Sequence, residues 1–495
     1  MPQSNLVRRF TGAVLAGVAS LSLGACATMP GSSIQPGTPI SQAEAQQGAQ
    51  YHEQFVQEFG GAVRGPQADY VVQVGQNIAV QSGLATTPDA FRVTLLNSSV
   101  NNAFAVPGGY VYVTRQLVGL MNNEAELAGV LGHEVGHVAA RHSARRQQAA
   151  QRNQLLGVLG QVVSGVLLGD SALGRGAADL LNTGTQLATL SYSRSQETEA
   201  DQLGINYLRT AGYDPAAMST VLASLARQNA LDQQLQGQQA TVPEWASTHP
   251  DPASRVAAAR NMAGPQAGGV LNRETFLSRI NGLTYDDDPA QGVIDGQSFI
   301  HPQFRLTFSV PQGFTMSNGA QAVSITGGNG QGQLASAPFS GNLDTYVQQV
   351  FQALAGQGGT LAPQALQRTT VNTLPAVYGT ARVNSGQQQV DVVVFAYQFS
   401  NNQAFHFATI SPVGEAGVFN PMFNSMRRLS AAEAAEVVPR RIEVVTAARA
   451  DSVASLARRM AYTTGQVERF RVLNGLPGNA ELVPGQQYKI VVRSN

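Results

Sequence analysis

Residues 131–142 read LGHEVGHVAARH, and this stretch decides the fold of the first half of the chain. Two histidines four residues apart, His133 and His137, project from the same face of a helix, so both can bind one metal ion. Glu134 follows the first histidine and is therefore placed to take a proton from water that the metal activates. The surrounding residues 124–139 are mostly apolar and contain no proline, as such a helix requires. A surface helix with two solvated histidines is the structural alternative.

A third metal ligand is needed, and acidic residues further along the chain are the candidates. A structural zinc site is closed by four protein ligands, whereas a hydrolytic site keeps one position open for water. The single cysteine cannot close the site, so the third ligand must be His, Asp or Glu. Residues 192–201, YSRSQETEAD, begin a helix with an acidic first turn. Glu197 and Asp201 share a face, so one can bind metal while the other orients a ligand histidine. Spacing alone does not choose among Glu197, Glu199 and Asp201.

Length and charge limit the possible functions. The chain has 495 residues, which is too many for one hydrophobic core and predicts several domains. Its 31 Lys and Arg residues balance 31 Asp and Glu residues. Because no broad basic field exists, binding to nucleic acid is not expected.

The N-terminus predicts a lipid anchor. Two arginines precede an apolar run that has the length of a signal-peptide core and is too short to span a bilayer. The run ends at LGAC, residues 23–26, which resembles the lipobox of bacterial lipoproteins. Residues 1–25 are therefore expected to be a lipoprotein signal peptide and Cys26 the acylated first residue; an ordinary signal peptide is the alternative. Ala27 favours the outer membrane over the inner one. Residues 26–45, rich in Pro, Gly and Ser, are predicted to be a flexible tether.

The pattern between residues 46 and 263 is mainly helical. Two strand-like runs, 91–96 and 104–113, are expected to pair as a hairpin or to form edge strands beside the site. The apolar stretch 155–168 is too short and interrupted for a membrane span and predicts a buried helix or a plug near the cleft. Helices are predicted at 42–59, 70–82, 124–148, 197–210 and 215–227.

The motifs LGHEVGHVAARH and SRSQETEAD (193–201) together resemble the HExxH zinc metallopeptidase family of HtpX and CAAX-prenyl protease type, in its BepA-like periplasmic branch. The resemblance covers residues 42–262, and its four motifs occur in the right order. It implies a mainly helical zincin-type metallopeptidase domain with one Zn²⁺ per chain. It also implies that Glu197 is the third ligand, beside His133 and His137, and that Asp201 orients a ligand histidine.

Two further motifs match the same family. NAFA (102–105), followed by Pro-Gly-Gly, resembles its substrate-edge segment, in which Asn102, with Ala103, would contact the substrate backbone. STHP (247–250), followed by Arg255, matches a late motif whose His and Arg lie over the active site. The resemblance implies that His249 and Arg255 stabilise the developing oxyanion, or that His249 caps the zinc in a closed state. A turn end and a helix-surface charge are the structural alternatives.

The other histidines are not expected to bind the metal. His142 lies five residues past His137 and so faces elsewhere on the helix, where it is expected to pack or to cap the helix end. His52, His301 and His406 belong to no pattern and are assigned no role.

The C-terminal half predicts two more domains and makes the chain an α+β multidomain protein. Residues 264–297 carry several glycines and an Asp-Asp-Asp-Pro run and are predicted to be a linker. Residues 298–429 alternate in strand fashion around a helix and are weakly similar to the PsbP/Mog1-like antiparallel α+β fold, with a binding or spacer role. Residues 441–493 resemble a LysM domain, a small βααβ module that often binds peptidoglycan. Ala450 replaces the usual glycine of that module, which weakens the case for glycan binding.

The sequence thus predicts a zinc-dependent endopeptidase of the bacterial cell envelope, lipid-anchored and facing the periplasm, on the outer membrane rather than the inner one. Water activated by Glu134 would hydrolyse peptide bonds in the quality control of misfolded or stalled envelope and outer-membrane proteins. The expected partners are such unfolded proteins, the membrane through the anchor, and peptidoglycan through the LysM-like domain. The alternative is a non-proteolytic periplasmic chaperone or cell-wall-binding scaffold, which has no need for Glu134.

Overall fold

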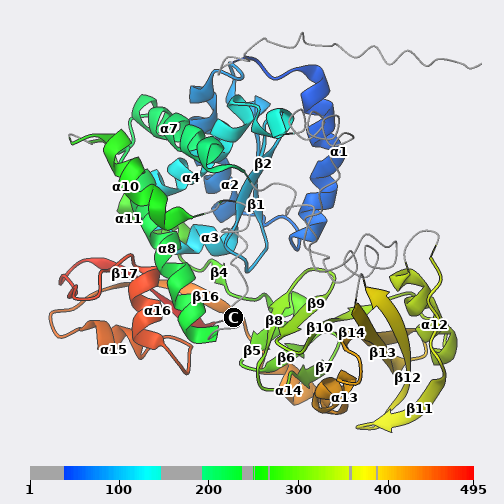
Figure 1. The fold of residues 1–495 in the computed structure, drawn as a ribbon. Helices are drawn as coiled ribbons and strands as arrows, with labels where there is room; N and C mark the ends of the chain where they lie inside the picture. The colour runs from blue at the N-terminus through cyan, green and yellow to red at the C-terminus, as the bar shows by residue number, and fades with distance from the viewer. Residues whose placement is uncertain are drawn as a thin grey trace, which may run out of the picture. The chain divides into compact units, whose positions relative to one another are not determined.

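A computed structural model gives the fold of most of the chain after residue 37 (Figure 1). The predicted signal peptide, Cys26 and the apolar stretch 155–168 lie outside the described residues. Among the residues described, no helix has both the length and the apolar character that crossing a membrane requires. The structure describes residues 38–146, 192–236, 249, 251–265, 268–355, 359–385 and 388–494.

Helix α4 (Glu124–Ala139) carries the HEVGH motif and is buried along its whole length. The Asn123 side chain accepts a hydrogen bond from the Glu126 N–H and so caps one of the amides that a helix start leaves unpaired. The prediction that this helix runs to residue 148 is wrong. It ends at Ala139, and Arg141 has a φ of 51°, in the left-handed region, before a short helical turn begins at residue 142.

Helix α7 (Arg194–Thr210) packs against α4 at very close range. A Cβ atom on Gly204 would lie 3.0 Å from the backbone nitrogen of His133. A Cβ atom on Gly136 would lie 3.0 Å from the carbonyl oxygen of Ala200. Both positions therefore need glycine, and the close approach brings the acidic side chains of α7 to the histidines of α4.

A small sheet with strand order β1-β3-β2 lies next to α4. Strand β1 (Arg92–Leu96) pairs parallel with β3 (Tyr110–Thr114), and β3 pairs antiparallel with β2 (Ala103–Val106). The hairpin is thus formed within the second predicted run rather than between the two runs. Gly108 and Gly109 make its turn with φ values of 90° and 81°, which disfavour other residues. Strand β2 is at the edge of the sheet.

Further helices surround this sheet and the α4–α7 pair (Figure 1). The helices predicted at 42–59, 70–82 and 215–227 are present with changed ends, as α1 (Gln42–Glu58), α2 (Pro66–Ala79) and α8 (Ala217–Gln236). The sequence did not predict α3 (Arg115–Leu120), α10 (Pro252–Ala263) or the short 3₁₀ turns at Val80–Ser82 and Pro88–Ala90.

The segment 264–297, predicted to be a linker, is folded over its described part. Helix α11 (Arg273–Ile280) buries Phe276 and Leu277 in the core of the first half. Strand β4 (Thr284–Tyr285) pairs with the C-terminal module, and β5 (Val293–Asp295) joins a sheet of the following region. A 3₁₀ turn, Pro289–Gln291, lies between them. Apolar residues among the glycines supply this packing.

The region after β5 is built on a seven-stranded antiparallel sheet with order β11-β12-β13-β14-β10-β9-β8. Helix α12 (Leu343–Leu354) covers one face of this sheet. The hydrophobic core on the other face includes residues of α13 (Asn420–Ser425) and of a second, four-stranded sheet with the order β15-β7-β6-β5. The large sheet has strands β8 (Phe314–Asn318), β9 (Val323–Gly327), β10 (Gly330–Ser336), β11 (Leu366–Val371), β12 (Leu374–Ser385), β13 (Gln388–Ser400) and β14 (Gln403–Pro412). The smaller sheet adds β6 (Ser298–His301), β7 (Leu306–Ser309) and β15 (Arg427–Arg428), and η6 (Ala416–Phe419) and α14 (Ala431–Ala435) lie in the connections.

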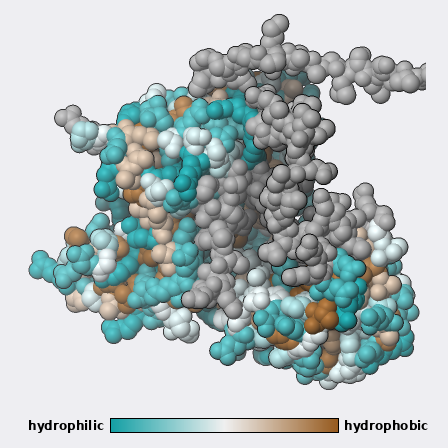
Figure 2. Space-filling view, viewed as in Figure 1, coloured by the Kyte–Doolittle hydropathy of each residue, from teal (hydrophilic) through white to brown (hydrophobic). Residues whose placement is uncertain are grey.

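The C-terminal module has the order β16-α15-α16-β17, and β16 pairs antiparallel with both β17 and β4. Its buried residues, among them Ile442, Phe470 and Tyr488, belong to the same core cluster as α2, α4 and α8. The chain is therefore an α+β protein with a helical first part and a sheet-rich second part, as predicted. Figure 2 shows a mostly hydrophilic face with scattered hydrophobic residues. The bounds are β16 (Arg440–Thr446), α15 (Val453–Ala457), α16 (Gln466–Leu473) and β17 (Gln487–Arg493).

Candidate metal centre

Four buried side chains place their donor atoms within 4.8 Å of one another: His133 and His137 of α4, Glu197 of α7, and His249. The Nε2 atoms of His133 and His137 are 3.0 Å apart. The Glu197 carboxylate lies 3.4 Å from His137 Nε2 and 3.6 Å from His133 Nε2. His249 Nδ1 is 3.1 Å from Glu197 Oε1 and 3.4 Å from His133 Nε2. The structure thus brings together the three predicted ligands and the predicted cap.

The hydrogen bond between His133 and Asp201 determines which ring nitrogen of His133 directs a lone pair at the cluster. His133 Nδ1 lies 2.9 Å from Asp201 Oδ1. An ionised carboxylate can only accept, so Nδ1 carries the proton and Nε2 offers an electron pair. Lone pairs and a carboxylate that meet at 3.0–3.6 Å repel one another unless a cation lies among them. The donor set therefore fits a metal ion.

The electrostatics of the cluster also favour a cation. Burial would raise the pKa of Glu197, but the histidines around it hold that pKa far below its usual value, so the carboxylate is ionised. Burial keeps the pKa of His137 well below its usual value, so its ring is neutral. Burial also acts to lower the pKa of His133, yet Asp201 and Glu197 outweigh it and raise that pKa to about 9. Either a proton on His133 or a bound metal ion can balance the excess negative charge of Asp201 and Glu197.

Glu134 is an acidic residue of the site whose carboxylate makes no hydrogen bond within the described part of the chain. Both of its oxygens are buried and lack a hydrogen-bond partner there. Its Oε1 atom lies 3.4 Å from His249 Nε2, close enough for an ion pair when that ring is protonated. Burial raises the pKa of this carboxyl above its usual value, which makes it a better proton acceptor when ionised. A buried carboxylate without a hydrogen bond is costly and indicates a function rather than a structural role.

Arg255 of α10 holds the two carboxylates behind the cluster. Its guanidinium donates to both oxygens of Asp201, from Nε at 2.8 Å and from Nη2 at 2.6 Å, and its Nη1 also donates to Glu197. Its side chain is buried, and the pKa of Asp201 is lowered to about 2, although burial opposes this, because His133 and Arg255 bind the ionised form. These contacts tie α10 to α7, so Arg255 lies behind the carboxylates in this structure.

The predicted substrate-edge residues, Asn102 and Ala103, lie at β2, a strand at one edge of the small sheet, and both are buried. Asn102 immediately precedes β2, and Ala103 is the first residue of that strand. The Asn102 side chain is buried, and neither its Oδ1 nor its Nδ2 has a hydrogen-bond partner among the residues described. Further along β2, Ala105 and Val106 line a small cavity together with His137. The cavity links this strand to the cluster.

Sequence reasoning missed the role of His142. The expectation that this residue faces away from His137 is wrong, because the helix ends at Ala139 and the left-handed Arg141 turns the chain back. His142 Nδ1 lies 2.7 Å from His137 Nδ1. The ring of Tyr192 stacks on His137 with ring centroids 3.8 Å apart, on the same side of the site. A positive φ at a non-glycine residue carries no signal in the sequence that would have predicted this contact.

The remaining histidines lie away from the cluster. His52 Nδ1 is 3.0 Å from the Tyr112 hydroxyl, and His406 Nδ1 is 2.8 Å from the Tyr346 hydroxyl. The ring of His301 stacks on Phe304. In the described part of the chain none of the three joins a group of potential metal ligands.

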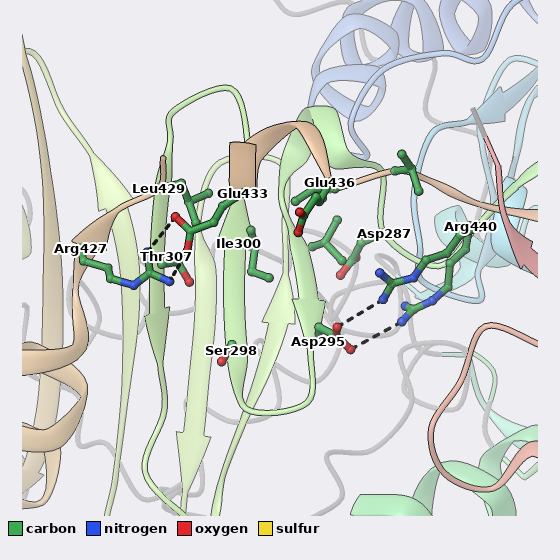
Figure 3. Close-up of a pocket in the computed structure, with 14 residues that line it drawn as sticks. Asp287, Asp295, Ser298, Ile300, Thr307, Arg427, Leu429, Glu433, Glu436 and Arg440 are labelled. Carbon is green, nitrogen blue, oxygen red and sulfur yellow. Dashed lines mark hydrogen bonds and ion pairs between the residues drawn. The ribbon is translucent and has the colours of Figure 1, made fainter. Parts of the chain in front are cut away.

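A separate cavity of about 300 Å³ lies beside the four-stranded sheet (Figure 3). Five of its charged side chains form ion pairs: Arg427 with Glu433 at 2.8 Å, and Asp295 with Arg493 at 3.3 Å and with Arg440 at 3.6 Å. Asp287, also in the lining, accepts hydrogen bonds from the Ser99 hydroxyl and the Ile294 N–H.

Comparison with known proteins agrees with this site. Residues 66–263 match the family model "Peptidase family M48". The chain is 33% identical to the beta-barrel assembly-enhancing protease of Escherichia coli K12 over 57% of each chain. It is 34% identical to the mitochondrial metalloendopeptidase OMA1 of Arabidopsis thaliana over 28% of this chain and 26% of that one. It thus spans little more than half the length of the assembly-enhancing proteases.

Among solved structures, the solution structure of cyanobacterial PsbP from Synechocystis aligns with 28% of this chain and 98% of its own length, at 9% identity and a TM-score of 0.22. So low a score does not support a shared fold. The family resemblance that the sequence motifs predicted is nevertheless confirmed by the match of residues 66–263 to the model of peptidase family M48 and by the similarity to the relatives.

Proposed function

We propose that this protein is a zinc-dependent endopeptidase of the bacterial cell envelope that degrades misfolded or stalled outer-membrane proteins. The observation that carries the proposal is the Glu134 carboxylate, buried and, among the residues described, without a hydrogen bond beside a cluster of converging metal donors. The match of residues 66–263 to the model of a peptidase family supports the same conclusion.

In this proposal His133, His137 and Glu197 hold one Zn²⁺ per chain. Two imidazoles and one carboxylate are a common zinc ligand set in hydrolytic enzymes, where the fourth position serves the reaction; His249, the fourth donor of the cluster, would have to leave that position free. Zinc held there supplies Lewis-acid chemistry, which polarises a carbonyl and makes water more acidic. Asp201 keeps the His133 ring in the ligating tautomer, and Arg255 holds Asp201 and Glu197 in place.

The protein's own groups perform the remaining steps. A carboxylate oxygen of Glu134 takes a proton from the attacking water and returns it to the amide nitrogen of the leaving peptide. The buried amide of Asn102 and the backbone at Ala103 bind an extended substrate along the edge strand β2, since strand edges present free backbone groups. An unfolded chain can adopt this extended form, whereas a folded β-barrel has no free segment to offer.

The relatives favour the substrate class. The beta-barrel assembly-enhancing proteases are named for the assembly of β-barrels, and the similarity covers 57% of this chain. We therefore propose unassembled β-barrel precursors as substrates. A non-proteolytic chaperone or scaffold is disfavoured because it would gain nothing from a buried Glu134 that makes no hydrogen bond in the described part of the chain.

The remaining parts of the proposal concern location. Acylation of Cys26 within LGAC, after a signal peptide at 1–25 and before a tether at 26–45, would fix the protein to the outer membrane, facing the periplasm. The order β16-α15-α16-β17 supports a LysM-like domain at 441–493, which would bind peptidoglycan. Residues 298–429 would form a PsbP/Mog1-like spacer or binding domain between it and the peptidase domain at 46–263.

The substrate proposal is tested with one β-barrel protein in two states. We expect the zinc-loaded chain to cleave the barrel protein when it is unfolded in urea and diluted into buffer, and to leave the same protein intact when it is folded in detergent. A chelator should abolish cleavage, and added zinc should restore it. Cleavage that survives chelation, or equal cleavage of both states, would contradict the proposal.

We further propose that His249 caps the metal and holds the site closed. Its Nδ1 lies 3.1 Å from Glu197 Oε1 and 3.4 Å from His133 Nε2, and its Nε2 is 3.4 Å from Glu134 Oε1. The ring would therefore fill the space that water and substrate need. The open form would then be a minor state, commonly about 0.1–10% of a population. The change His249→Ala is expected to raise kcat/KM on the unfolded barrel roughly tenfold or more.

Peptide cleavage by the His249→Ala protein, measured at saturating zinc, separates the two roles of this residue. A rise supports capping. A fall would instead support stabilisation of the oxyanion, and an unchanged rate would remove His249 from the site.

A further inference from the structure

A chain of three side chains runs from the metal cluster to the surface on the side of His137. His142 is fully buried, and its Nδ1 is 2.7 Å from His137 Nδ1. On its other side, His142 Nε2 is 3.1 Å from Glu199 Oε2, and Arg145 Nη1 is 2.9 Å from the same oxygen. The side chains of Glu199 and Arg145 are 38% and 49% exposed, so the chain ends in solvent.

When both imidazoles are neutral, the protons along this chain have only one arrangement that satisfies every contact. Two nitrogens 2.7 Å apart share a single proton, because two protons would clash and two lone pairs would repel. The Glu199 carboxylate, which is paired with Arg145, can only accept, so the proton on His142 is at Nε2. His142 Nδ1 is then a lone pair and accepts from His137 Nδ1–H. His137 Nε2 is left as the lone pair that faces the cluster.

The reverse arrangement would disable His137. If His142 donated from Nδ1, His137 would carry its proton on Nε2, directed at His133 and Glu197. A neutral imidazole can take either tautomer, and only a partner fixed behind it decides between them. For His133 that partner is Asp201, which contacts the ring directly. For His137 the partner carboxylate is Glu199, which acts through the imidazole of His142.

We propose that His142 and Glu199 are positioning residues that hold His137 in its metal-binding tautomer. The inference rests on the proposed zinc site and adds to it a second route by which the protein prepares a ligand. It assigns a task to each acidic residue of the α7 first turns: Glu197 faces the cluster, Asp201 faces His133, and Glu199 faces His142. Residues that orient a metal-ligating histidine typically contribute 10–100-fold to metal affinity, on the order of what is expected here.

The test measures zinc affinity by competition with a chromophoric chelator, without any substrate. The change Glu199→Ala removes the acceptor, and the zinc dissociation constant is expected to rise about 10–100-fold. Thr198→Ala is the matched control, because Thr198 is exposed, lies next to Glu199 on α7 and, among the residues that the structure describes, its hydroxyl donates to the Arg194 carbonyl alone. Glu199→Gln keeps a side-chain oxygen that can accept from His142 Nε2, so it should restore much of the lost affinity.

Three outcomes decide the matter. A dissociation constant of Glu199→Ala equal to that of Thr198→Ala would overturn the proposal. So would a Glu199→Gln protein as weak as Glu199→Ala, since charge rather than the acceptor would then be responsible. Support requires the graded series, with the thermal midpoints of the metal-free proteins equal. If the unchanged protein binds zinc but cleaves nothing, the proposed function fails while this inference stands.

Discussion

Replacing Glu134 with Gln is expected to lower kcat/KM for peptide cleavage by about 10²–10⁴-fold, the range that general acid–base catalysis commonly supplies. The side chain keeps its size, but an amide cannot take a proton from water. Neither oxygen of Glu134 makes a hydrogen bond in the described part of the chain, so the substitution breaks none there; it removes the charge that faces His249 Nε2 at 3.4 Å. The measurement is cleavage of the unfolded barrel protein at saturating zinc.

The stability of the same variant separates a catalytic role from a structural one. Burial raises the pKa of Glu134, which means that its ionised form is disfavoured in the fold. A neutral Gln removes that penalty, so the thermal midpoint of Glu134→Gln should equal or exceed that of the unchanged protein. A variant that unfolds earlier, or that cleaves at the original rate, would show that Glu134 does not act as the base.

Lys489→Met is expected to have the largest effect on stability. Lys489 of β17 is fully buried, and its Nζ donates to the carbonyl oxygens of Gly119 at 2.7 Å and of Leu120 at 3.3 Å, and also to that of Met121. These are carbonyls that the end of α3 leaves without helical partners. Two residues later, Asn123 starts the metal-binding helix α4. Lys489 thus connects the C-terminal module to the segment that immediately precedes the metal-binding helix α4.

The substitution Lys489→Met is expected to lower the free energy of unfolding because it leaves buried polar groups without their partner. Burial holds the pKa of Lys489 well below its usual value, while the buried Glu126 nearby opposes that shift. With methionine, the carbonyls of Gly119 and Met121 lose this donor, while that of Leu120 keeps its hydrogen bond from Asn122 Nδ2. Glu126 also loses a nearby positive charge, and together these losses should cost about 3–5 kcal/mol. We expect the thermal midpoint of the first half of the chain to fall by roughly 10 °C.

Arg493→Met is the matched control for Lys489→Met. Arg493 is the last residue of the same strand and is half exposed, and its pair with Asp295 at 3.3 Å is open to solvent. Exposed pairs contribute about 0–1 kcal/mol, so this variant should melt close to the unchanged protein. Equal thermal midpoints for the two variants would mean that the contact of Lys489 with the segment before α4 does not stabilise the metal site.

Sequence predicted the parts of the site that depend on local periodicity. The spacing of His133 and His137 on an apolar helix, together with the position of Glu134, was enough to place a metal and a base. The choice among the three acidic residues of α7 was not local. It depends on the close approach of α4 and α7 at Gly204, and there the family resemblance supplied Glu197 before the structure placed it in the cluster.

Other features had no signal that sequence reasoning could use. Arg141 adopts a left-handed conformation that side chains rarely take, and this single dihedral angle brings His142 to His137. The predicted linker is folded because Phe276 and Tyr285 pack into a core made by distant elements. Lys489 read as an ordinary strand residue, and only its contacts with α3 give it a role. Each case depends on long-range packing, which overrides local patterns.

The most direct test of the central claim is the zinc content of the purified chain and of its Glu134→Gln variant, measured by elemental analysis on the samples used for the cleavage assay. We predict one zinc per chain in both, held by His133, His137 and Glu197, with cleavage only by the unchanged protein. Loss of zinc from Glu134→Gln would make Glu134 a ligand, and a chain that binds no zinc while still cleaving peptides would contradict the account altogether.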